Sequence, residues 1–130
     1  MADQVPYKPY VPASESPREF TLRAVLLGVV MAVVLGAANA YIGMVAGLTI
    51  AATFPAAVVA LAALRPMGGT ILEENIARTT ASVGEALVAG AIFTIPAFVI
   101  AGVWDSINFV IATIIMMVGG ILGVLFVIIL

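Results

Sequence analysis

Long apolar stretches separated by short polar segments dominate the chain. No charged residue occurs from Ala24 to Leu64, a run of 41 residues. A single helix of that length would measure about 61 Å, roughly twice the thickness of a bilayer's hydrocarbon core. We therefore expect the run to fold back at the glycine-rich residues 36–47, giving two membrane spans at about 22–41 and 48–64.

Two further apolar stretches follow a polar segment at residues 65–78. Residues 79–103 contain one charged residue, Glu85, and residues 109–130 contain none. A helix over 79–103 would measure about 37 Å, enough to cross a core of roughly 30 Å with some tilt. The pattern therefore predicts an all-α, polytopic integral membrane protein with about four transmembrane helices.

The chain opens with a polar, proline-rich tail, residues 1–20, ahead of the membrane region at 21–130. Ser16 and Glu19 have the spacing of a capping box, and Pro17 suits the first position of a helix. We therefore expect a helix to begin at Pro17.

A second capping box is expected in the polar segment 65–78. Thr70 and Glu73 have the required spacing, and Glu74 and Arg78 form a potential i, i+4 ion pair. These residues predict a short interfacial helix that leads into the next span.

Composition narrows the class of protein. Hydrophobic residues make up 64% of the 130 residues and charged residues only 9%, whereas soluble domains carry roughly 25% charged residues. Five basic residues are too few for a nucleic-acid surface. The chain has no Cys and no His, so it offers neither a thiolate nor an imidazole for catalysis or metal binding. We expect no enzyme activity, no cofactor, no metal site and no nucleic-acid partner.

Two rows of small residues, spaced four apart, predict faces where helices pack closely. They comprise Gly28, Ala32, Gly36 and Ala40 in the first span, and Ser82, Ala86, Gly90 and Thr94 in the third. Pro55 and Pro96 predict kinks in the second and third spans.

Three polar residues are candidates for a substrate or ion pathway. Glu85 borders the second row of small residues, so we expect it to face other protein or a polar cavity. It lies nearer one end of its span, and the alternative is a carboxylate near the headgroups, held by an Arg or a backbone amide. Asn39 and Tyr41 could hydrogen-bond a solute, or could satisfy backbone groups in the expected turn.

The distribution of basic residues predicts the orientation. Lys8, Arg18 and Arg23 precede the first span, and Arg65 and Arg78 lie between the second and third. The expected turns at 42–47 and 105–108 contain no Lys or Arg. The positive-inside rule therefore predicts a cytoplasmic N-terminus, and we expect the plasma (inner) membrane.

Three blocks of sequence resemble the N-terminal part of the oligopeptide transporter (OPT) family. They are PREFTLRAVLLGVV, GAANAYIGMVAGLTIAATFPAAVVALAALR and ILEENIARTTASVGEALVAGAIFTIPA. The resemblance runs from about Tyr7 to Trp104. It implies a polytopic secondary transporter that imports peptides or peptide-like metal chelates, generally with proton coupling. The implied partners are membrane lipid, the substrate, protons and the remaining spans of a larger transporter.

The last apolar stretch ends at Leu130 without a polar flank, so we expect the chain to be an N-terminal fragment. Two other functions fit the residues alone. One is a small four-span exporter or channel subunit that oligomerises, and the other is a membrane scaffold without transport activity.

Overall fold

The computed structural model describes residues 9–130, so Lys8 and the start of the predicted tail lie outside it. Four α-helices follow one another: α1 (Leu22–Ala46), α2 (Thr53–Leu64), α3 (Ile71–Ile100) and α4 (Phe109–Ile129). A short 3-10 helix, η1 (Arg65–Met67), extends α2. The helices α1, α3 and α4 are long and apolar enough to cross a membrane. These features confirm the predicted all-α membrane fold.

Helix α1 begins at Leu22, and the predicted start at Pro17 is wrong. Thr21 is the N-cap, and its hydroxyl accepts a hydrogen bond from the backbone N–H of Ala24. The carbonyl of Arg18 instead accepts a hydrogen bond of 2.7 Å from the hydroxyl of Thr70. The segment before Thr21 therefore joins α1 to the start of α3.

The turn predicted within 36–47 comes only at the end of that segment, because α1 remains helical to Ala46. A Cβ added to Gly36 would lie 3.4 Å from Val88, and one added to Gly43 would lie 3.1 Å from Ile92. These glycines therefore allow α3 to approach closely and do not break the helix. Only Gly47, with a φ of 69°, adopts the left-handed conformation that ends it.

Helix α2 is shorter than the span predicted at 48–64. Its 12 residues reach about 18 Å, well below the thickness of a membrane core. Residues 47–52, which were expected to belong partly to this span, are not helical. Pro55 lies in the first turn of α2, where proline is tolerated, and not in the middle of a span.

Helix α3 joins the predicted interfacial helix and the third span in one helix of 30 residues. The predicted capping box is confirmed, since Thr70 and Glu73 exchange side-chain and backbone hydrogen bonds. Pro96 lies inside α3, which continues to Ile100. The expected ion pair of Arg78 with Glu74 is replaced by a hydrogen bond of 2.6 Å from Arg78 to Asn75.

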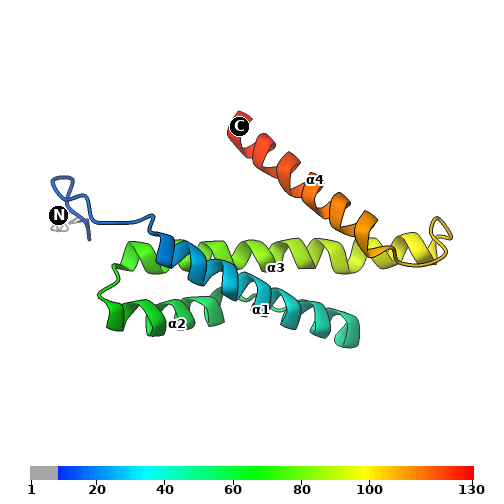
Figure 1. The fold of residues 1–130 in the computed structure, drawn as a ribbon, viewed down its shortest axis with the longest axis horizontal. Helices are drawn as coiled ribbons and strands as arrows, with labels where there is room; N and C mark the ends of the chain where they lie inside the picture. The colour runs from blue at the N-terminus through cyan, green and yellow to red at the C-terminus, as the bar shows by residue number, and fades with distance from the viewer. Residues whose placement is uncertain (1–8) are drawn as a thin grey trace, which may run out of the picture.

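Helices α1 and α3 run parallel and form the main contact of the structure (Figure 1). Helix α2 packs against the first half of α3, and α4 turns away after contacting α3. The buried core is small and consists mainly of alanines, together with Met31 and Leu64. Small side chains therefore set the distances between these helices.

Candidate functional site

An ion pair joins the first turns of α1 and α3. The Nε and Nη2 atoms of Arg23 donate to the two carboxylate oxygens of Glu73 at 3.0 and 2.7 Å. The Glu73 side chain is fully buried, whereas that of Arg23 is 38% exposed. Thr70 adds a backbone N–H bond of 2.9 Å to the same carboxylate. Glu73 therefore acts at once as a helix cap and as the partner of α1.

The Arg23 guanidinium, with hydrogen bonds from Thr21 and Thr70, holds the pKa of the Glu73 carboxyl at about 2, below its ordinary value of 4.5. Glu73 precedes the predicted span at 79–103 and lies in the first turn of α3. A carboxylate with so low a pKa stays ionised near neutral pH, so Glu73 keeps the charge that pairs with Arg23.

Arg23 also connects α1 to the end of α2. Its Nη1 atom donates a bond of 2.9 Å to the carbonyl of Met67, the last residue of η1. Arg23 therefore holds together three segments at one end of the helices: the start of α1, the end of α2 with η1, and the start of α3.

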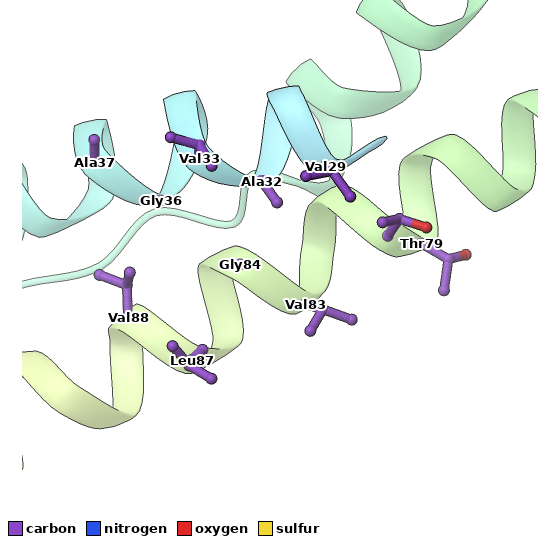
Figure 2. A pocket seen from close by; sticks show the side chains of 11 residues that line it. Val29, Ala32, Val33, Gly36, Ala37, Thr79, Val83, Gly84, Leu87 and Val88 are labelled. Atoms are coloured by element: carbon purple, nitrogen blue, oxygen red, sulfur yellow. The ribbon is translucent and has the colours of Figure 1, made fainter. Parts of the chain in front are cut away.

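The contact between α1 and α3 borders an apolar groove (Figure 2). Figure 2 shows Ala32 and Gly36 of α1 opposite Gly84 and Val88 of α3. The two polar side chains that line the groove, Thr79 and Thr80, donate their hydroxyls to the carbonyls of Asn75 and Ile76 within α3. The groove is therefore a surface for packing against apolar groups, and it offers no free polar group to a peptide.

The row of small residues in α1 lies largely along this contact. A Cβ on Gly28 would lie 2.5 Å from the Cβ of Thr80, and Ala32 is covered by Gly84. Ala40 is half-buried.

The row of small residues in α3 lies on another side of that helix. Ala86, Gly90 and Thr94 line a hollow between α3 and α4, and Ser82 donates its hydroxyl to the carbonyl of Arg78. No heavy atom would lie within 4 Å of a Cβ on Gly90. This row therefore leaves space beside α4.

Asn39 is buried in α1, with only 3% of the residue exposed. Its side-chain oxygen accepts a bond of 2.8 Å from the backbone N–H of Ile50, in the non-helical segment 47–52. Its side-chain nitrogen is buried and has no hydrogen-bond partner within residues 9–130. The side-chain oxygen of Asn39 therefore holds segment 47–52 against α1, and its side-chain nitrogen is a donor without a partner in residues 9–130.

Glu85 lies at the middle of α3 and is half-buried. It is 12 residues beyond Glu73, about 18 Å along the helix. Glu85 forms no ion pair with any residue in 9–130, where the one ion pair joins Arg23 and Glu73. Its carboxylate is placed where a charge is costly unless a partner or water supports it.

The three pathway candidates are not joined to one another by hydrogen bonds in residues 9–130. Tyr41 is 66% exposed on α1, and no hydrogen bond of the described residues joins it to Asn39 or Glu85. No group of three side chains of ligand type in residues 9–130 could hold a metal ion.

Sequence reasoning missed two features of this site. It did not pair Arg23 with Glu73, although both lie in first turns next to apolar stretches. It also did not recognise Ala77, Ala81 and Gly84 as the face of α3 that meets α1, although their spacing of three and four was visible.

Comparisons with known proteins give a consistent result. The family model described as "OPT oligopeptide transporter protein" matches residues 19–130. A protein of Haemophilus influenzae named "Putative oligopeptide transporter" is 38% identical over 87 residues, which are 66% of this chain. The match spans 14% of the length of that relative. No solved structure matches the chain.

Proposed function

The chain belongs to the OPT oligopeptide transporter family, and from this premise we propose that it forms part of a secondary transporter that imports oligopeptides across a membrane. The family match over residues 19–130 carries the proposal. The name of the Haemophilus influenzae relative supports peptides as the substrate class, and peptide-like metal chelates are the second candidate. The match covers 14% of the length of that relative, so other segments of such a transporter would supply the rest of the pathway.

Proton coupling is the second part of the proposal, and Glu85 is its candidate carrier. The carboxylate lies at the midpoint of α3, is half-buried and has no ion-pair partner in residues 9–130. A carboxyl group at this depth can exist in a neutral form at low energetic cost and in a charged form when water or a partner reaches it. These two states are what a proton-coupled cycle requires.

The orientation is proposed from the basic residues, with the N-terminus and residues 65–70 in the cytoplasm of a plasma-membrane transporter. This orientation needs both segments on the same side of the membrane. The hydrogen bond from Arg23 to Met67 supports it, because it brings the start of α1 and the end of η1 together. Residues 105–108, at the other end of α3, would then face outward.

Uptake by the full-length transporter that contains this chain tests the function. The purified protein is reconstituted in lipid vesicles, and uptake of radiolabelled tri-alanine is followed with and without an acidic exterior. We expect accumulation above the external concentration only with the proton gradient. Uptake that is equal to that of protein-free vesicles would contradict the proposal and favour the scaffold function.

A further inference from the structure

A hollow with basic side chains, here called the basic hollow, lies at the start of α1 beside the ion pair of Arg23 with Glu73. It measures about 500 Å³ and is lined by Arg18, Thr21, Leu22, Arg23, Leu26 and Glu73. The charge of the fully buried Glu73 is matched by Arg23, so the charge of Arg18 has no counterpart among the lining residues. The basic hollow therefore carries one net positive charge.

Hydrogen-bond donors remain available in the basic hollow. The Arg23 guanidinium donates two bonds to Glu73 and one to the carbonyl of Met67, which leaves some of its N–H groups unused. Its side chain is partly exposed, so a ligand can reach these groups. Arg18 is exposed, and its side chain forms no ion pair or hydrogen bond within residues 9–130. Two guanidinium groups that line one hollow favour a phosphate, whose oxygens accept several N–H bonds at once.

The main chain holds Arg18 in place, although this residue precedes α1. Its carbonyl accepts the hydrogen bond from the hydroxyl of Thr70, the residue that caps α3. This bond uses the backbone of Arg18 and leaves its guanidinium available for a ligand. The folded contact between the two helix starts therefore positions Arg18 at the basic hollow.

The apolar groove of Figure 2 continues from the basic hollow along the same side of α1. Leu22 and Leu26 line the basic hollow, and Val29 and Val33 line the groove. Their spacing of four, three and four residues places these exposed side chains on one face of α1. From Leu22 to Val33 this face measures about 17 Å, close to half of a hydrocarbon core of roughly 30 Å.

We propose that the basic hollow and the groove together bind one anionic phospholipid, with its phosphate at Arg18 and Arg23 and an acyl chain along the apolar face of α1. A positive group at one end and an apolar face as long as one leaflet match the two parts of such a lipid. An apolar helix from another segment could fill the groove, but it would supply no anion for Arg18. This inference goes beyond the proposed function and does not depend on transport.

Lipid titration of the full-length protein that contains this chain is the first test, and it needs no variant. The midpoint of thermal unfolding in detergent is followed as dioleoyl-phosphatidylglycerol, dioleoyl-phosphatidylcholine or inorganic phosphate is added. We expect phosphatidylglycerol to raise the midpoint at a concentration about fivefold lower than phosphatidylcholine does, the effect of one basic residue near an anionic lipid. Equal effects of the two lipids would overturn the proposal. Inorganic phosphate that acts as well as phosphatidylglycerol would also overturn it, since the site would then bind a free anion.

Arg18→Gln tests the phosphate end, because it removes the charge and keeps the backbone bond to Thr70. We expect the apparent affinity for phosphatidylglycerol to fall about fivefold. The control is Arg65→Gln, since Arg65 is also exposed but does not line the basic hollow. Equal losses in the two variants would overturn the site, because the total charge and not its position would then decide binding. Arg23 stays unchanged, since its loss would also break the ion pair with Glu73.

Val33→Trp tests the acyl-chain end, because it places a bulky ring at the groove. The control is Val34→Trp, since Val34 is similarly exposed but does not line the groove. We expect Val33→Trp to weaken phosphatidylglycerol binding about threefold, as the loss of about five carbon–carbon contacts would do. Val34→Trp should leave the affinity unchanged. An unchanged affinity in Val33→Trp, or equal losses in both variants, would overturn the binding of an acyl chain in the groove.

Discussion

Gly84 of α3 lies so close to Ala32 of α1 that a Cβ on Gly84 would be 2.7 Å from the Ala32 Cβ and 2.6 Å from its carbonyl oxygen. Real Cβ atoms do not approach backbone so closely, so any larger residue must push the two helices apart. We expect Gly84→Val to destabilise the protein by about 1–3 kcal/mol, the usual cost of overpacking. Thermal unfolding of the full-length protein in detergent measures this effect.

Gly90→Val is the matched control on the same helix. No atom lies within 4 Å of a Cβ at Gly90, and valine has a higher helix propensity than glycine. Its midpoint of unfolding should stay at or above that of the unmodified protein. Equal losses in the two variants would mean that the close contact of α1 with α3 does not contribute to stability.

The ion pair of Arg23 with Glu73 predicts a second loss of stability. Glu73→Gln keeps the size of the side chain but removes the charge that holds Arg23. We expect a cost of about 1–3 kcal/mol, below that of a fully buried pair because Arg23 is partly exposed to solvent. The control is Glu74→Gln, because Glu74 forms no ion pair within residues 9–130. We expect it to lower the free energy of unfolding by less than about 0.5 kcal/mol, as surface substitutions usually do.

The pH dependence of this cost follows from the lowered pKa of Glu73. A carboxyl whose pKa falls from 4.5 to about 2 on folding stabilises the protein fully above pH 4.5. This stabilisation is lost progressively as the pH falls from 4.5 toward 2. The difference in unfolding free energy between the unmodified protein and Glu73→Gln should therefore be constant from pH 6 to 8 and narrow in acid. A difference that disappears near pH 6 would contradict the assigned pKa.

The proposed orientation predicts which single cysteines an impermeant reagent labels. Met67→Cys and Ser106→Cys place a thiol at exposed positions, one before the start of α3 and one after its end, in a chain without native cysteine. We expect labelling from outside intact cells at position 106 and not at position 67. The reverse result would invert the orientation. Met67 is a better position than Gly68, whose φ of 67° strains any other residue.

The role of Glu85 predicts a separation of two transport modes. Glu85→Gln cannot exchange a proton, so accumulation driven by a proton gradient should be lost. Exchange of internal for external peptide should persist, because it requires no net change of protonation. Glu85→Asp should retain partial accumulation. Normal accumulation by Glu85→Gln would leave Glu85 with a structural role only.

The sequence predicted the helices better than their contacts. Absence of charge identified the apolar stretches, and the capping box at Thr70 and Glu73 located the start of α3. The end of α1 was misplaced because glycine favours two different structures. In an isolated chain it weakens a helix, whereas Gly36 and Gly43 are retained within α1 by packing against α3.

The candidate site was predicted only in part, because small residues occur on more than one face of α3. Spacing alone cannot distinguish Ala86 and Gly90, which lie beside α4, from Ala77 and Gly84, which contact α1. Similarly, Asn39 was recognised as polar, but its bond to Ile50 depends on a non-helical segment that returns along α1. The path of this segment depends on where α2 packs, and the sequence around Asn39 does not specify the position of α2.

The shortness of α2 has a consequence for how the protein enters the membrane during synthesis. Twelve apolar residues are too few for the translocation machinery to retain as an independent span. Helix α2 must therefore be held by α1 and by the first half of α3, which is synthesised after it. Arg23 cannot pair with Glu73 until α3 emerges, 50 residues later in the chain. We therefore expect α2 to become stably embedded only once α1 and α3 are both present.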